Sequence, residues 1–259
     1  MSFSFLIKRV DKKLNFGLVK KNGRNNQGRI CVYHRGSGKR FRAYSIDYHR
    51  RIQDIGIVYK LVFCPLRSAP LGLILYNSGF FSYIVLNEAL KLGSKFSSYL
   101  MSSSLFKQES LINLLGNIEF FTVVSMVELK PYMGASLARS AGAGLLNIGD
   151  SIDGKVLLKS PSGWLIRVSK TCLCTLGYVA GASHKMNKFL KAGERRQLGW
   201  KPVVRGVAMN PCDHPHGGGE GKKSPPRAHR TPWGKLTKCS PTTKKKINKI
   251  ARRLFKKVR

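Results

Sequence analysis

The sequence predicts a mainly β protein built from two small β-barrels in series, with long basic segments at both ends. Short runs rich in β-branched and aromatic residues recur at roughly ten-residue spacing and are separated by glycine-containing turns. Hydrophobic residues make up 42% of the 259 residues, which is enough to form a core. Positive charge lies mainly at the ends: residues 1–60 hold 15 basic and 3 acidic side chains and residues 195–259 hold 19 and 2, whereas residues 61–160 hold 8 and 6.

The first predicted barrel contains five strands. They are Arg29–His34, Arg40–Tyr48, Gly56–Phe63, Leu71–Tyr76 and Phe80–Leu86. The loop Asn77-Ser78-Gly79 joins the last two as a three-residue hairpin with a glycine for the left-handed position. Residues 69–87 carry no charge, but a membrane span needs about 20 mostly apolar residues, and these turn residues lie at the centre of the stretch. We therefore expect a hairpin and no membrane insertion.

A connector and a second barrel follow. Leucine and phenylalanine at 105, 106, 111, 114 and 115 predict an amphipathic helix over Ser102–Leu115. The second barrel begins near Ile118, and its predicted strands are Phe120–Leu129, Lys155–Leu158, Trp164–Val168 and Cys174–Val179. We expect a basic N-terminal arm over 1–22, the first barrel over 23–95, the connector over 96–117, the second barrel over 118–190 and a basic C-terminal extension over 191–259.

The C-terminal segment Thr243–Arg259 has a helical stripe surrounded by lysines and arginines. Its apolar members are Ile247, Ile250, Leu254 and Val258. A basic amphipathic helix can lie on a membrane or bind a partner.

The net charge of +35 predicts a polyanionic partner, which is a nucleic acid or an anionic membrane. The six cysteines are too sparse and irregular for a disulfide framework, which indicates a reducing compartment. The spacing of Cys172 and Cys174 puts both thiols on one face of a strand, where we expect buried structural thiols.

The segment Arg205–Lys222 is the densest motif, with two histidines, three consecutive glycines and two acids. It is no nucleotide P-loop, because Lys223 follows Lys222. A zinc site would use Cys212, His214 and His216, but without a recognised spacing. A catalytic Asp213–His214 pair has no nearby nucleophile. An ordered loop inserted into folded RNA gives every residue type a use, and the glycines would let the backbone approach a phosphate or base.

Two further glycine clusters suit RNA. Lys130–Gly144 is a long loop of small residues with one arginine and several hydroxyls, which fits a ribose–phosphate backbone, although a merely mobile loop is the alternative. Gly23–Arg29 combines amides, which bond base edges and 2′-hydroxyls, with arginines for phosphates.

Several motifs, in this order, resemble one family. They are Gly23–Ile30, His34–Lys39, Leu137–Gly142, Arg205–Gly221 with its Asp-His-Pro-His-Gly-Gly-Gly-Glu-Gly core, and Thr231–Gly234. The chain is similar over about residues 23–259 to the universal large-subunit ribosomal protein two in its bacterial form. The resemblance implies an oligonucleotide-binding-type barrel, then an SH3-like barrel, then an RNA-penetrating extension. It implies a structural protein that binds large-subunit rRNA and supports the peptidyl transferase region and subunit association, rather than an enzyme.

The departures from that family pattern favour a mitochondrial ribosome in the matrix, with a bacterial cytoplasm or a plastid as the alternative. The N-terminal segment is expected to be shorter than in bacterial members, Phe96–Asn117 matches poorly, and aromatic pairs stand at Phe80-Phe81 and Phe120-Phe121. Expected partners are rRNA, neighbouring ribosomal proteins and the small subunit through the inter-subunit interface. No cofactor is expected beyond rRNA-associated Mg²⁺, and no bound metal.

The residues expected to contact RNA are basic, amide, histidine and glycine positions of these segments with one tryptophan. They are Arg24, Asn25, Asn26, Arg29, His34, Arg35, Lys39, Arg40, Arg139, Ser140, Arg195, Arg196, Arg205, Asn210, Asp213, His214, His216, Gly217, Gly218, Gly219, Lys222, Trp233, Lys244 and Arg252. No catalytic residue is expected, and His214 is the weak candidate. Two other functions stay open: an RNA-acting enzyme using Asp213 and His214, and a basic membrane-surface protein using the C-terminal helix.

Overall fold

The computed structural model describes residues 12–50, 52, 54–97, 111–151, 153–219, 228–238 and 255–257. Two compact units make up the chain. We call the first the β unit; it comprises Met1–Leu18, Arg40–Lys188 and Arg252–Arg259. We call the second the basic unit; it comprises Val19–Lys39 and Phe189–Ala251. The predicted mainly β fold is confirmed, and its antiparallel sheets lie in the β unit.

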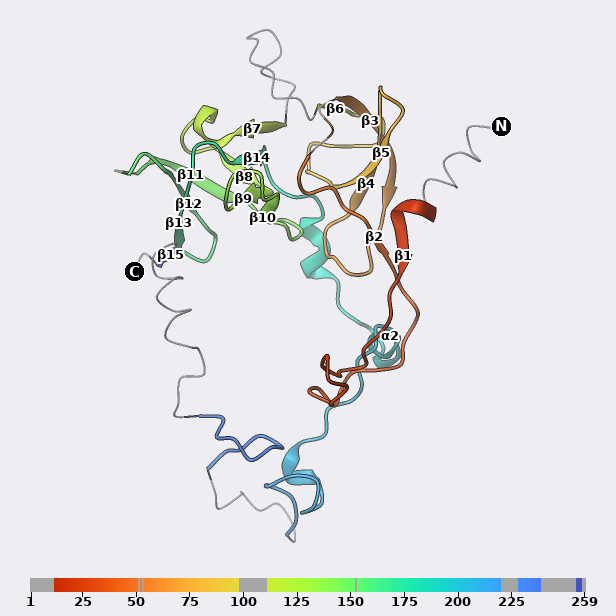
Figure 1. Ribbon diagram of the computed structural model, residues 1–259. Helices are drawn as coiled ribbons and strands as arrows, with labels where there is room; N and C mark the ends of the chain where they lie inside the picture. The colour runs from red at the N-terminus through yellow and green to blue at the C-terminus, as the bar shows by residue number, and fades with distance from the viewer. Residues whose placement is uncertain are drawn as a thin grey trace. The chain divides into compact units, whose positions relative to one another are not determined.

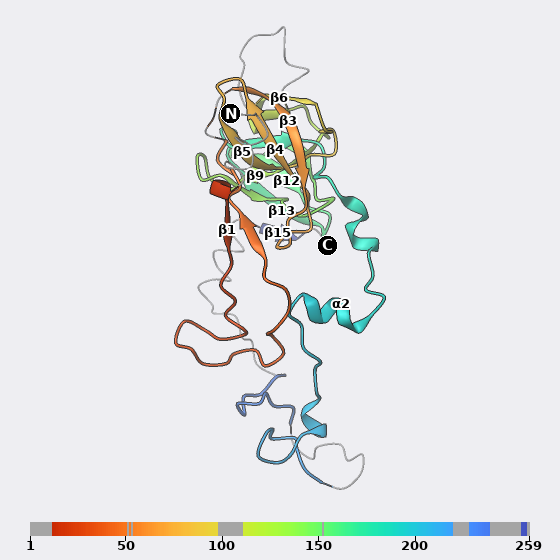
Figure 2. The same cartoon turned by 90° about the vertical axis from the view of Figure 1, so that its right-hand side faces the viewer.

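The first sheet of the β unit is antiparallel and four-stranded, in the order β5-β4-β3-β6 (Figure 1). Its strands are β3 (Ile55–Val62), β4 (Leu71–Tyr76), β5 (Phe81–Val85) and β6 (Lys95–Ser97). Figure 2 shows β3, β4 and β5 side by side. The predicted hairpin is confirmed: Leu75 pairs with Phe81, and Gly79 has φ +80° at the turn. The first barrel was predicted to end at residue 95. β6 begins at Lys95 and extends to Ser97, so it crosses that predicted boundary.

A two-stranded sheet accompanies it, formed by β1 (Asn15–Gly17) and β2 (Arg42–Tyr44). The predicted strand Arg40–Tyr48 is longer than the strand in the structure, where only Arg42–Tyr44 forms a strand, β2. The predicted strand Arg29–His34 is wrong. Cys31 and Val32 both donate backbone hydrogen bonds to the Gly23 carbonyl, so this run closes a local loop instead of joining a sheet.

The second sheet of the β unit has seven strands in the order β15-β13-β12-β11-β8-β14-β7. They are β7 (Ile112–Leu114), β8 (Val123–Ser125), β11 (Leu145–Asp150), β12 (Val156–Lys159), β13 (Trp164–Val168), β14 (Leu173–Leu176) and β15 (Phe255–Lys257). A separate pair is formed by β9 (Val127–Glu128) and β10 (Ala135–Leu137). β10 lies inside the segment predicted to be a loop, and β11 was not predicted.

Both predicted helices are wrong where the structure describes them. Residues 102–110 lie outside the described part, but Ile112–Leu114 forms β7 and pairs with β14. Residues 243–254 and 258–259 also lie outside it, whereas Phe255–Lys257 forms β15 and pairs with β13. In both places pairing with a sheet distant in sequence overrides a local helical pattern. Besides a short helical stretch at residues 12–14, the described helical segments are η2 (Leu115–Asn117), η3 (Ala182–Met186), α2 (Ala192–Gln197) and η4 (Gly206–Ala208).

Side chains from the two halves of the β unit pack together. One buried cluster combines Leu73 and Tyr83 of the first sheet with Met126, Ala135 and Val179 of the second half. A second buried cluster fills the second sheet and includes both thiols predicted to be buried, since Cys172 is 0% and Cys174 is 2% exposed. Among the described residues, no helix is long and apolar enough to cross a membrane.

Candidate nucleic-acid interface

Positive charge is densest in the basic unit. Its two segments hold 21 Lys and Arg against 3 Asp and Glu, whereas the longer β unit holds 26 against 9. A cluster of lysine and arginine on one part of a protein is the electrostatic footprint of nucleic-acid binding, because each cation that neutralises a phosphate releases a counterion. The basic unit is therefore the candidate nucleic-acid interface.

Backbone hydrogen bonds join the two segments of this unit, which are far apart in the sequence. The Gly36 amide donates to the Gly199 carbonyl at 3.0 Å and the Lys39 amide to the Gln197 carbonyl at 2.9 Å. In the opposite direction, the Lys201 amide donates to the His34 carbonyl at 3.0 Å. The contact is close at Gly38, where a Cβ atom would lie 2.5 Å from the Gln197 carbonyl oxygen. Predicted RNA-binding residues of both segments are thereby brought together.

Trp200 organises the cations at this junction. The Arg35 guanidinium carbon lies 3.2 Å from the centre of the Trp200 ring, and that of Arg195 lies 5.3 Å from it. Such cation–π contacts fix the direction of a guanidinium while its N–H groups stay available to an anion. Both arginines were predicted, but Trp200 was not. The available signal was a tryptophan four positions after Arg196, the end of the basic run Arg195-Arg196.

The side-chain amide of Asn25 shapes the loop that follows Gly23. Asn25 Oδ1 accepts hydrogen bonds from the backbone amides of Gln27 and Arg29, each at 3.0 Å. Its carbonyl oxygen is thus used internally, which leaves the Nδ2 group for a base edge or a 2′-hydroxyl. Arg24 and Arg29 are exposed on this loop and can reach phosphates.

The segment Arg205–Gly218 closes on itself around His214. The ring of His214 is buried, with 8% of the residue exposed, and its Nδ1 accepts the His216 backbone amide at 3.0 Å. A Cβ atom on Gly206 would lie 2.5 Å from this ring, so only glycine fits there. The Gly218 amide donates to the Met209 carbonyl at 3.1 Å and closes the loop.

The consecutive glycines have an internal use. A Cβ atom on Gly217 would lie 2.2 Å from the Asn210 carbonyl oxygen, and one on Gly218 would lie 2.6 Å from the Pro211 ring. Gly218 and Gly219 also have φ of +88° and +95°. These positions need glycine to close the loop even before any RNA approaches.

The loop lacks the geometry of a catalytic dyad. His214 Nδ1 takes its hydrogen bond from His216, and Asp213 is exposed with its backbone amide bound to the Asn210 carbonyl. His216 stacks on His214 with ring centres 5.2 Å apart, and its Nε2 accepts the Arg230 amide at 2.8 Å. Across the described residues, no group of three or more His, Cys, Asp or Glu side chains is placed to hold a metal ion.

A second cationic cluster lies in the β unit. The guanidinium carbons of Arg67 and Arg139 lie 5.0 and 5.2 Å from the centre of the Tyr48 ring. Burial raises the pKa of Tyr48, and the two arginines act in the opposite direction. Arg139 was predicted, whereas Arg67 was missed because it follows a short apolar segment with no other charge.

The predicted RNA-binding residues therefore divide into three groups. Arg40, Arg139 and Ser140 belong to the β unit. Lys222, Lys244 and Arg252 lie outside the described residues. The others belong to the basic unit; they are Arg24, Asn25, Asn26, Arg29, His34, Arg35, Lys39, Arg195, Arg196, Arg205, Asn210, Asp213, His214, His216, Gly217, Gly218, Gly219 and Trp233.

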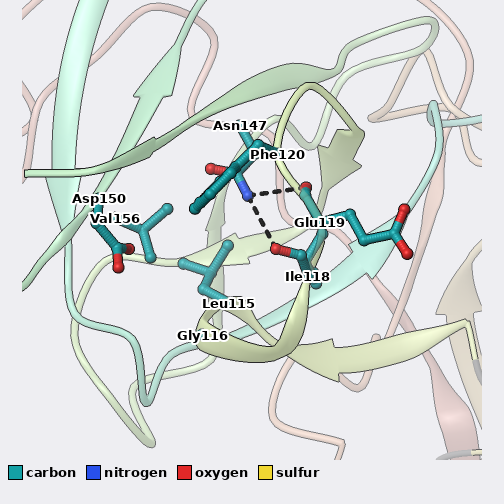
Figure 3. Close-up of a pocket in the computed structure, with 8 residues that line it drawn as sticks. All are labelled: Leu115, Gly116, Ile118, Glu119, Phe120, Asn147, Asp150 and Val156. Atoms are coloured by element: carbon teal, nitrogen blue, oxygen red, sulfur yellow. Dashed lines mark hydrogen bonds between the residues drawn. The ribbon is translucent and has the colours of Figure 1, made fainter.

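A pocket of about 350 Å³ in the second sheet is of a different kind (Figure 3). Asn147 Nδ2 closes one side by donating to the carbonyls of Ile118 at 3.3 Å and Glu119 at 3.1 Å. Its lining is apolar and acidic, consisting of Leu115, Gly116, Ile118, Glu119, Phe120, Asn147, Asp150 and Val156. Such a lining repels phosphate, so this pocket does not extend the interface.

Comparison with known proteins identifies two matching families. Residues 11–98 match the family described as Ribosomal Proteins L2, RNA binding N-terminal domain, and residues 110–234 match Ribosomal Proteins L2, C-terminal domain. Large ribosomal subunit protein uL2 of Orientia tsutsugamushi is 44% identical, over 91% of this chain and 85% of that protein. Large ribosomal subunit protein uL2m of Reclinomonas americana is 41% identical over 95% and 89%. The uL2 protein of Wolbachia pipientis is 42% identical over 96% and 89%.

Proposed function

Because the chain belongs to the ribosomal protein L2 family, we propose that it is a structural constituent of the large ribosomal subunit that binds rRNA. It acts by binding and not as an enzyme. The observation that carries the proposal is the match of both family domains across a chain whose basic unit holds 21 Lys and Arg against 3 acids.

The arrangement of the basic unit supports a binding mode. Arg35 and Arg195 are held on Trp200, and the loop around His214 is closed by its own hydrogen bonds. Preorganised cations and a rigid loop lose less entropy when they enter folded RNA than mobile ones would. Phosphate contacts position the protein on the RNA, and amides such as Asn25 Nδ2 can contact bases.

Its finer role follows from the same proposal. The loop around His214 supports the peptidyl transferase region, and the protein contributes to association with the small subunit. Its partners are large-subunit rRNA and neighbouring ribosomal proteins. The protein uses no cofactor of its own, and Mg²⁺ takes part only as ions bound to rRNA, which neutralise phosphates that lysine and arginine do not reach.

We place the protein in a mitochondrial ribosome, with a bacterial ribosome as the alternative. The similarity to the uL2m protein of Reclinomonas americana supports the mitochondrial assignment, whereas the similarity to uL2 of Orientia tsutsugamushi fits either compartment. Fractionation of the source cell, with the protein followed in purified mitochondria after protease treatment, separates the two. Protection inside the organelle supports the assignment, and recovery only in a bacterial ribosome contradicts it.

Sedimentation tests the proposed function. The tagged full-length chain should move with the large ribosomal subunit through a sucrose gradient and stay bound after a wash in moderate salt. A protein that stays at the top of the gradient, with the large subunit assembled below it, would contradict the proposal.

A matched pair of variants tests the electrostatic contribution. Arg35→Gln removes a charge held at the junction of the basic unit, and Lys95→Gln removes one from an exposed position of β6 in the β unit. We expect the first variant to be washed from the subunit at lower salt than the second. Equal salt resistance of both would show that the basic unit does not carry the binding.

A further inference from the structure

Two exposed aromatic rings stack on each other in the basic unit. The ring centres of Tyr33 and Trp233 are 5.8 Å apart and their planes are inclined by 26°. Tyr33 is 53% and Trp233 is 56% exposed. Aromatic pairs gain stability by stacking, but rings buried on both sides would not stay half exposed. Each member of this pair therefore covers one face of the other and leaves further ring surface open.

Trp233 is presented at the tip of a tight turn. The Gly234 amide donates to the Thr231 carbonyl at 2.9 Å, and Pro232 and Trp233 are the two central residues of this turn. Thr231 Oγ1 also accepts the Lys235 amide at 3.2 Å. A proline in the first central position fixes the backbone, so the indole ring is held outward at little entropic cost.

Backbone hydrogen bonds of the residues before and after Tyr33 fix its position. The amide of Val32 donates to the Gly23 carbonyl at 3.1 Å, and the His34 carbonyl accepts the Lys201 amide at 3.0 Å. A Cβ atom on Gly23 would lie 2.1 Å from the Val32 carbonyl oxygen, which shows how closely this loop is packed. The two rings thus come from segments that are each held by their own backbone contacts.

We propose that Tyr33 and Trp233 form a stacking platform for one unpaired RNA base. The inference rests on the proposed binding of rRNA and names a recognition element within it. Every base has a flat face, so stacking on an aromatic platform needs no sequence match. Bases inside a duplex are already stacked on both sides, which selects a base from a loop, a bulge or a single strand.

The charge around the platform favours RNA over a protein partner. Arg230 and Lys235 flank Trp233 in its turn, and His34 and Arg35 follow Tyr33 directly. The base that stacks carries a phosphate on each side, and Arg35, Arg230 and Lys235 can neutralise them. A basic peptide of another ribosomal protein would be repelled by the same side chains.

Fluorine NMR of the full-length chain labelled with 5-fluorotryptophan tests the platform directly. The three tryptophans, Trp164, Trp200 and Trp233, give three resonances, which substitutions of each by phenylalanine assign. The probes are an oligoadenylate of twelve nucleotides and inorganic polyphosphate of equal charge. We expect oligoadenylate, and not polyphosphate, to shift the Trp233 resonance upfield while the Trp164 resonance stays in place. A Trp233 resonance unmoved by saturating oligoadenylate would overturn the proposal.

Affinities measured on the same probes give an independent readout. Tyr33→Ala and Trp233→Ala should each weaken oligoadenylate binding by about 5- to 160-fold, the range of one stacked base, and leave polyphosphate binding unchanged. Tyr33→Phe keeps the ring and should bind as the unchanged protein does. Equal losses for both probes would mean that the rings only hold the two segments together, and would overturn the platform. Such a result leaves the ribosomal function intact, because that function fails only if the chain does not sediment with the large subunit.

Discussion

His214 holds the loop Arg205–Gly218 in shape. Its Nδ1 is occupied by the His216 amide, and its ring packs against Gly206, where a Cβ atom would lie 2.5 Å away. A general acid–base histidine needs a partner that orients it and a reachable proton. Nδ1 of His214 is the ring nitrogen that would face an orienting carboxylate, but it accepts the His216 amide instead. The face of the ring packs against Gly206. Both parts of the ring are therefore used for loop structure.

His214→Gln in assembled ribosomes should therefore lower the rate of peptide-bond formation by less than about tenfold. General acid–base catalysis contributes about 10²–10⁴-fold, and a residue that only positions RNA should stay below this range. Glutamine keeps a polar planar group at the position. Single-turnover peptide-bond formation on purified particles measures the effect.

The control for this variant is His184→Gln, which changes an exposed histidine of η3 in the β unit. It should leave both assembly and rate unchanged. A loss of a hundredfold or more in His214→Gln, with sedimentation and tRNA binding intact, would establish a chemical role for His214.

The buried thiols of the second sheet give a pH-dependent prediction. Burial raises the pKa of Cys172 from 9.0 to about 11, because the thiolate would lie in an apolar core. A folded-state pKa above the unfolded value favours folding below about pH 9, and this contribution is lost as pH rises toward 11. The free energy of unfolding should thus decline above pH 9 by less in Cys172→Ala than in the unchanged protein.

Thiol labelling at pH 8 checks the same environment. The exposed Cys31 and Cys212 should react with iodoacetamide in the native protein, whereas Cys172 and Cys174 should react only after unfolding. Tandem mass spectrometry, which fragments the peptide shared by Cys172 and Cys174, distinguishes these four positions. Native-state labelling of Cys172 at the rate of Cys31 would contradict the buried assignment.

At the scale of elements, strands with strong local patterns were predictable. Leu71–Tyr76 and Trp164–Val168 have the predicted bounds, because apolar and β-branched residues end at turn residues on both sides. β11 (Leu145–Asp150) was missed because Asn147 and Gly149 weaken its pattern; the structure satisfies the buried Asn147 amide with two carbonyls. β15 was unpredictable, since only its pairing with the distant β13 makes it a strand.

The residue types of the candidate site could be predicted from the sequence, but the contacts between its distant segments could not. The glycine-rich and basic segments carry their chemistry in local sequence, so candidate binding residues could be named from them. The cation–π contact of Arg35 with Trp200 joins positions far apart in the chain, and no local pattern reports such a contact. The same reason hid the stacking of Tyr33 on Trp233.

Trp200→Ala should loosen the junction between the two segments of the basic unit. An exposed cation–π contact contributes about 0.5–1 kcal/mol, so the protection of the Gly36 and Lys39 amides from hydrogen exchange should fall about two- to fivefold. Both amides donate across the junction. Hydrogen exchange followed by NMR on the full-length chain measures the change.

Trp164→Ala is the matched control, because Trp164 is 41% exposed and lies on β13 in the β unit. It should leave the protection of the Gly36 and Lys39 amides unchanged. If Trp200→Ala also left it unchanged, the backbone hydrogen bonds alone would hold the junction.

At the scale of the whole molecule, packing and charge are divided between the units. The β unit contains the buried clusters, including one shared by both of its halves. The basic unit holds 21 of the 47 Lys and Arg, together with the closed loop and the aromatic rings. A unit with this much unbalanced charge repels itself unless a polyanion is bound, so binding and stability of the basic unit should be coupled to RNA.

The central claim is that the protein binds rRNA chiefly through phosphate contacts of its basic segments. The salt dependence of its affinity for a large-subunit rRNA fragment tests this claim most directly. Each phosphate neutralised contributes about −0.7 to −0.9 to the slope of log K against log salt concentration, so roughly ten contacts predict a slope of about −7 to −9. A slope near −1 would contradict the account, because shape and stacking would then dominate the binding.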